Sequence, residues 1–190
     1  MKEFLIKIWR FLRWPLGILV VLYVALVIYR IPAVGEKERT EEAVARIHAS
    51  RLTMADVMGE HLPLPPNEEE NNVTLAGIDN NQNGIRDDVE LAIFAKYPSD
   101  ARIRAAELQY AKELQMEFTE VFNSETLVAV IQEEDRGSLC IGDNDQQIHE
   151  VEDAVFNTDV RRQKREEVFD KYMTSYKLLN TEVCDISLQD

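Results

Sequence analysis

The feature that most constrains this chain is an uncharged apolar run of 16 residues from Trp14 to Tyr29, bounded by Arg13 and Arg30. Such a run favours a helix in an apolar environment, where it would cover about 24 Å against a hydrocarbon core of about 30 Å. The two arginines can extend this length because their side chains reach toward the lipid headgroups. The run therefore predicts a membrane-spanning element near the N-terminus.

The orientation follows from the basic residues that precede the run, because positive charge is retained on the cytoplasmic side of a membrane. We predict a cytoplasmic tail at residues 1–13 and a transmembrane signal-anchor at residues 14–30, with the C-terminal domain outside the cytoplasm. The protein would then be a single-pass protein of the inner (cytoplasmic) membrane. The alternative is a cleaved signal peptide, since the small residues of Ala33-Val34-Gly35 suit processing near Gly35 and would leave a secreted protein.

The net charge of −14 is unevenly distributed. Residues 1–35 carry five basic residues against Glu3, a balance of +4, which leaves −18 for residues 36–190. A surface this acidic repels phosphate polymers, so we expect no nucleic-acid partner.

The chain has two cysteines, Cys140 and Cys184. In an oxidising compartment an even pair of this kind predicts one disulfide, which would stabilise the fold by about 3 to 4 kcal/mol. The alternative is a pair of buried free thiols.

Apolar residues recur at helical spacing along most of the remaining sequence, and no useful strand alternation occurs. Residues 31–72 combine a juxtamembrane helix with a proline-rich linker, and residues 73–190 form a helical domain. Within that domain we expect an extended segment at 73–78 and a last helix at about 158–182. The predicted fold is mainly α: an N-terminal transmembrane helix followed by a small helical domain.

The loop at residues 79–90 carries the clearest chemistry in the sequence. It reads Asp-Asn-Asn-Gln-Asn-Gly-Ile-Arg-Asp-Asp-Val-Glu and matches the pattern D-x-[DN]-x-[DN]-G-x5-E in full. Calcium requires six to eight oxygen ligands, and a short loop supplies them when alternate side chains converge on one point. Gly84 permits the sharp turn that this convergence needs.

These twelve residues resemble the calcium loop of the EF-hand superfamily. The resemblance implies one Ca²⁺ ion with a set of side-chain and backbone oxygen ligands: Asp79, Asn81, Asn83, Ile85 through its carbonyl, Asp87 and Glu90. The sequence departs from a paired EF-hand because its entry segment is extended, Arg86 replaces an apolar pairing residue and no second loop occurs. It is similar to the lone loops of some exported bacterial proteins, in which the ion is structural.

No catalytic motif accompanies the loop. His48, His61 and His149 are scattered, and none has zinc-ligand spacing. We therefore expect a membrane-anchored, extracytoplasmic, non-enzymatic protein with a structural calcium ion, which contacts the membrane through residues 14–30 and acts as a scaffold or partner-binding subunit. The alternative is an exported, hydrolase-like enzyme whose fold is stabilised by calcium.

Overall fold

The computed structural model describes the backbone of residues 2–179 and 181–188, and the side chains of these residues from 13 onward except 28 and 31–33. The described part is mainly helical and contains no strand, so the predicted α class is confirmed. The chain divides into two units, residues 1–42 and residues 43–190.

Helix α1 (Lys2–Ala49) makes up the described part of the first unit, and its last residues, from 43 onward, belong to the second unit. Among the described residues, no helix has both the length and the apolar character that crossing a bilayer requires. The predicted transmembrane helix at 14–30 and the single-pass inner-membrane location are therefore wrong. The physical reason is that Arg13 and Arg30 limit the uncharged run to about 24 Å of helix, short of a core of about 30 Å. The side chains of the predicted tail, apart from Arg13, and of Ala33 in the proposed cleavage segment lie outside the described set.

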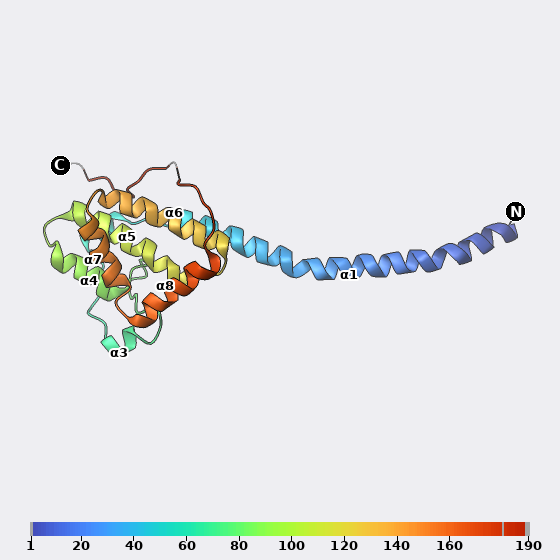
Figure 1. Cartoon of the computed structure of the whole chain (residues 1–190), viewed down its shortest axis with the longest axis horizontal. Helices are drawn as coiled ribbons and strands as arrows, with labels where there is room; N and C mark the ends of the chain where they lie inside the picture. The colour runs from blue at the N-terminus through green and yellow to red at the C-terminus, as the bar shows by residue number, and fades with distance from the viewer. Residues whose placement is uncertain (1, 180, 189–190) are drawn as a thin grey trace. The chain divides into compact units, whose positions relative to one another are not determined.

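The second unit begins with the last turns of α1 and continues through shorter helices (Figure 1). Their bounds are α2 (Met54–Met58), α3 (Glu68–Asn71), α4 (Asp87–Lys96), α5 (Ala101–Thr119), α6 (Ser124–Ile141), α7 (Asp145–Val155) and α8 (Asp159–Tyr172). Most begin where a short polar side chain accepts a hydrogen bond from a backbone N–H of the first turn: Thr53, Asn67, Asp100, Asn123, Asn144 and Thr158.

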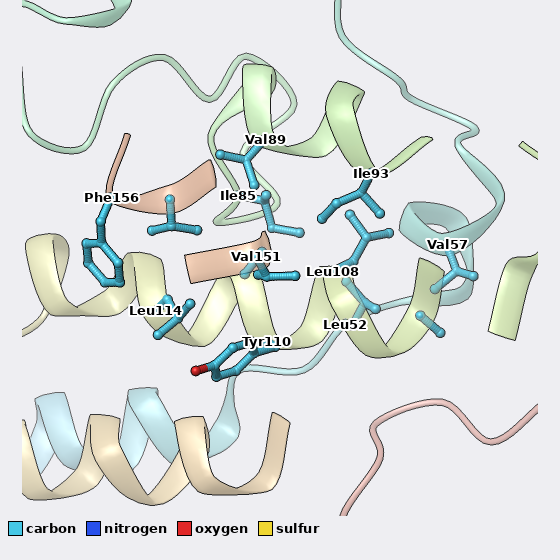
Figure 2. Packing of buried hydrophobic residues seen from close by; sticks show 13 residues of the cluster. Leu52, Val57, Ile85, Val89, Ile93, Leu108, Tyr110, Leu114, Val151 and Phe156 are labelled. Carbon is cyan, nitrogen blue, oxygen red and sulfur yellow. The ribbon is translucent and has the colours of Figure 1, made fainter. Parts of the chain in front are cut away.

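Helix α5 forms the centre of this unit and packs against α4, α6, α7 and α8. Its buried residues Leu108 and Leu114 meet Ile85 and Val89 from the loop and α4, together with Val151 from α7 (Figure 2). Removing this apolar surface from water is the main stabilising term for the unit. The candidate loop is therefore continuous with the core.

Helix α6 passes very close to α5 at Gly137. A Cβ atom placed there would lie 1.9 Å from Oε2 of Glu113 and 2.9 Å from the backbone Cα of Tyr110. Helix α6 continues past this glycine to Ile141. The absence of a side chain at Gly137 allows α5 and α6 to approach each other closely.

The C-terminal segment also differs from the expectation. The predicted helix at 158–182 ends at Tyr172, and residues 173–179 and 181–188 contain no helix. The predicted disulfide is confirmed: Cys140 and Cys184 are bonded, with 5.1 Å between their Cα atoms. Asp185 anchors the segment because its carboxylate pairs with Arg136 over 2.7 Å and with Arg51 over 3.3 Å.

Candidate metal-binding loop

The loop at residues 79–90 turns tightly before it enters α4. Gln82 and Gly84 have positive φ angles of 58° and 88°, the region that a residue with a side chain adopts at a cost. The loop closes where the backbone N–H of Asp87 donates to the carbonyl of Ile78 over 2.8 Å. The predicted sharp turn at Gly84 is present.

Four of the predicted ligands converge inside this turn. The side-chain amides of Asn81 and Asn83 donate to the two oxygens of Glu90, each over 3.0 Å. The carboxylate of Asp79 accepts from the backbone N–H groups of Asn83 and Gly84 over 3.2 and 2.9 Å. The side chains of Asn81, Asn83 and Glu90 therefore meet, and Asp79 is held in the same turn by the backbone. Wrapping an ion requires such an approach of ligands from different parts of a loop.

Asp87 has a different role. Its carboxylate is buried and accepts from the backbone N–H of Asn80 over 2.9 Å and from the Asn80 side-chain amide. It therefore closes the loop by joining its second residue to the start of α4. Ile85 buries its side chain in the core, and its N–H donates to Oδ1 of Asn83 over 2.8 Å.

Burial makes the carboxyl groups of Glu90 and Asp79 costly to ionise. Desolvation raises the pKa of Glu90 to about 7, although the amides of Asn81 and Asn83 oppose this shift. Desolvation also raises the pKa of Asp79, against the backbone N–H groups that donate to it. A bound cation would favour the ionised form of both groups.

The predicted ligands Asp79, Asn81, Asn83, Ile85, Asp87 and Glu90 include three acidic residues, and the expectation that these three form one metal-binding group is not met. In the described part of the chain, no three or more His, Cys, Asp or Glu side chains are grouped so that they could hold a metal ion. The reason is visible at Asp87, whose carboxylate is engaged by Asn80. The convergent set contains two acidic residues, Asp79 and Glu90, and two amides.

Arg86 occupies the position where a paired EF-hand carries an apolar residue. It is fully buried, and its guanidinium donates to the carbonyl oxygens of Val155 and Ala154 over 3.0 and 2.8 Å at the C-terminal end of α7. It also pairs with Asp88 over 2.5 Å. Arg86 thus attaches the loop to α7, where a cation also interacts favourably with the helix dipole. The sequence feature that pointed to this different role was the charge of Arg86 at a position where a paired EF-hand carries an apolar residue.

Arg161 organises the segment that leads into the loop, a role that the sequence did not reveal. It is 1% exposed, and its guanidinium donates to Leu75, Asn71 and Thr74 carbonyls and to the side chains of Asn72 and Asn157. Asn71 in turn accepts from the N–H of Ile78 over 2.9 Å. Residues 73–76 bend, and carbonyls of this stretch accept from Arg161, so the segment at 73–78 is not the extended segment that was expected.

The histidines lie apart from this loop chemistry. The ring of His48 contacts Oε1 of Glu133 over 2.7 Å, and the ring of His149 is on the surface, 3.2 Å from Glu152. His61 approaches the loop through its backbone carbonyl, which accepts from Asn81 over 3.2 Å. His61 and His149 therefore take part in separate contacts.

The comparisons with known proteins add no further identification. No family model, no curated protein and no solved structure matches this chain.

Proposed function

We propose that residues 79–90 bind one Ca²⁺ ion, which stabilises a non-enzymatic helical domain that acts as a scaffold or partner-binding subunit. The observation that carries the proposal is the meeting of Asn81 and Asn83 with both oxygens of Glu90. Asp79, Asn81, Asn83 and Glu90 would hold the ion with the carbonyl of Ile85, and Asp87 would support the loop.

The donor set fits a hard cation. Carboxylate, amide and carbonyl oxygens are the ligands that calcium prefers, and the loop has no thiolate or imidazole that would favour zinc. In the structure the amide nitrogens face Glu90. Rotation of each side-chain amide by half a turn puts its oxygen where its nitrogen now lies. A cation bound there would remove the cost of burying the Glu90 carboxylate.

The hydrogen bonds that hold the loop and the segment before it support a structural ion rather than a conformational switch. Arg86 fixes the loop to α7, and Arg161 fixes the preceding segment to α8. A loop held on both sides has little freedom to open when an ion binds. We therefore expect calcium to raise stability without a large change in helix content.

The test is calorimetric titration of the full chain with CaCl₂, paired with thermal unfolding in CaCl₂ and in a chelator. Calcium should bind at one site and raise the melting temperature, and Glu90→Gln should remove most of both effects. Glu69→Gln, an exposed glutamate of α3, is the matched control and should behave as the parent chain. Absence of binding heat together with an unchanged melting temperature would falsify the calcium proposal.

A further inference from the structure

The C-terminal segment lies along helix α6 and runs in the same direction as that helix (Figure 1). Gln132 donates to the carbonyl of Lys177 over 2.7 Å, and one helical turn later Arg136 donates to the carbonyl of Glu182 over 2.8 Å. The described residues of the segment form no helix of their own. The segment is therefore held by its contacts with the domain, as a bound peptide would be.

The carboxylate of Asp185 is buried at the end of this segment. Its side chain is 3% exposed and lies 2.7 Å from Nη2 of Arg136 and 3.3 Å from Nε of Arg51. Its second oxygen accepts from the backbone N–H of Leu52 over 2.8 Å. Hydrogen bonds between charged partners are stronger than those between neutral ones. These donors together form a carboxylate-binding site.

The site requires a negative charge. Glu133 pairs with both Arg51 and Arg136, so one carboxylate faces two guanidinium groups, and Asp185 supplies the second negative charge. Glu113 lies 3.7 Å from Arg136, but burial raises the pKa of that carboxyl group well above its ordinary value. Without Asp185, the buried Arg136 would carry an uncompensated charge, which is costly. Departure of Asp185 therefore leaves a site that favours another carboxylate.

The neighbouring residues of the segment are recognised mainly through their backbone. Gln109 on α5 donates to the carbonyl of Val183 over 3.0 Å and accepts from the N–H of Asp185 over 2.8 Å. Backbone contacts of this kind can be made by many sequences. The side chains of Ile186 and Leu188 pack against the main apolar cluster. The site therefore suits an aspartate that is followed by apolar residues one and three positions later.

The disulfide holds this aspartate at its site. Cys184 directly precedes Asp185 and is bonded to Cys140 near the end of α6. A covalent link keeps the effective concentration of the segment far above that of a free competitor. Cys140 is partly exposed and lines a cavity of about 400 Å³, through which a thiol can reach it. The segment is thus secured by a bond that is accessible to a reductant.

A dithiol breaks this bond by exchange. One thiolate of the dithiol attacks a sulfur of the disulfide, forms a mixed disulfide and releases the other cysteine as a thiolate. The second thiol of the dithiol then displaces the remaining cysteine. The dithiol is oxidised to its own disulfide, and its two protons end on the two cysteines. The segment is then held by noncovalent contacts, and a segment without helix opens at low cost.

We propose that Arg51, Leu52, Gln109 and Arg136 form a binding site for an aspartate-containing peptide segment of a partner protein, and that the C-terminal segment blocks this site while the disulfide is intact. A second copy of the chain is a poorer occupant, because its C-terminal segment would make the same contacts without the advantage of attachment. The inference rests on the partner-binding part of the proposed function and gives that role a ligand class. It does not depend on calcium.

The test is fluorescence anisotropy of a labelled peptide with the sequence of residues 181–188 and the change Cys184→Ser. It is added, in the presence of a chelator, to the oxidised parent chain, to Cys140→Ser/Cys184→Ser, and to this double variant with Asp185→Asn added. The oxidised parent chain should not bind the peptide. The triple variant should bind it at least about tenfold more tightly than the double variant, because its own segment competes less well.

Two changes in the peptide provide a matched pair that removes the same charge. Asp185→Asn in the peptide should weaken its binding at least about tenfold, because the two guanidinium groups lose their carboxylate. Glu182→Gln in the peptide should bind as the unchanged peptide does, since Glu182 is recognised through its backbone carbonyl. Equal losses from the two changes would indicate unspecific attraction to an acidic peptide and would overturn the proposal.

Failure of the triple variant to bind the peptide also overturns the proposal, as does equal binding by the oxidised parent chain. Dimers of the opened chain that the peptide does not dissociate would identify a second copy as the occupant and refute the assignment to a partner. If the triple variant does not fold, as judged by circular dichroism, the parent chain in dithiothreitol takes its place and must bind the peptide more tightly than the oxidised chain. Calcium titration is a separate measurement, so failure of one proposal leaves the other standing.

Discussion

Arg86 donates a hydrogen bond to the carbonyl oxygen of Val155 over 3.0 Å, which joins the candidate loop to the end of α7. The residue stands where a paired EF-hand would contact a sister loop. Here the contact is made within the same domain, by a fully buried guanidinium that pairs with Asp88. A lone loop can therefore be held in shape without a partner loop.

Replacement of Arg86 by Met should lower the free energy of unfolding by about 3 kcal/mol. The substitution removes donors from two buried carbonyls and leaves Asp88 without its ion-pair partner. Urea unfolding measures the loss. Lys164→Met, which removes an exposed ion pair on α8, should change stability by less than about 1 kcal/mol. Equal effects of the two substitutions would show that the buried contacts of Arg86 contribute nothing specific.

Arg161 should be equally sensitive to a conservative change. Lysine keeps the charge but has a single ammonium group, which cannot reach acceptors as widely placed as Asn71, Leu75 and Asn157. Arg161→Lys should cost about 2 to 3 kcal/mol and increase hydrogen exchange in residues 71–78. Its neighbour Arg162, which pairs with the exposed Asp159, provides the control through Arg162→Lys. Unchanged protection of residues 71–78 would contradict the assigned role.

Asp87 and Glu90 should respond differently to neutralisation. Asp87→Asn weakens the hydrogen bonds to Asn80 and should lower stability in calcium-free buffer by about 1 kcal/mol. Glu90→Gln removes a buried acid whose pKa is raised to about 7, so it should cost little in calcium-free buffer and should weaken calcium binding by at least about tenfold. Thermal unfolding with and without calcium separates the two cases. The assignment fails if Asp87→Asn weakens calcium binding more than Glu90→Gln does.

Features of the fold that depend on local sequence patterns were predicted correctly. The α class, the turn at Gly84 and the Cys140–Cys184 bond each follow from spacing or residue type, and the structure confirms them. The predicted membrane span was wrong, because no helix among the described residues has both the length and the apolar character that crossing a bilayer requires.

Other features depend on tertiary packing that no local pattern contains. Arg161 belongs to a run of charged residues, and Arg162 and Lys164 do form exposed ion pairs as such a run suggests. Only the folded chain brings Asn71 and Leu75 to Arg161. Buried charge is therefore the part of this fold that sequence reasoning missed.

Removal of the disulfide should release the C-terminal segment. Cys140→Ser/Cys184→Ser should lower the free energy of unfolding by about 3 to 4 kcal/mol, because the bond closes a long loop in the unfolded chain. Proteolysis should then cleave within residues 173–188, although the ion pair of Asp185 with Arg136 remains. A reductant should not destabilise the double variant further. A segment that resists proteolysis without the bond would show that Asp185 and Gln109 suffice to hold it.

Gly137→Ala tests the close approach of α5 and α6. In most exposed helix positions alanine is more favourable than glycine by about 1 kcal/mol. Here the added Cβ would lie 2.9 Å from the Cα of Tyr110, and backbone cannot move aside as a flexible side chain can. The helices must separate, which strains the core and disturbs Glu113, so the variant should lose about 1 to 3 kcal/mol in urea unfolding. Ser138→Ala, at the next position of the same helix, should change stability far less, because its hydroxyl bonds only to the carbonyl of Asp135. A Gly137→Ala variant more stable than the parent chain would mean that α5 and α6 are not packed as closely as described.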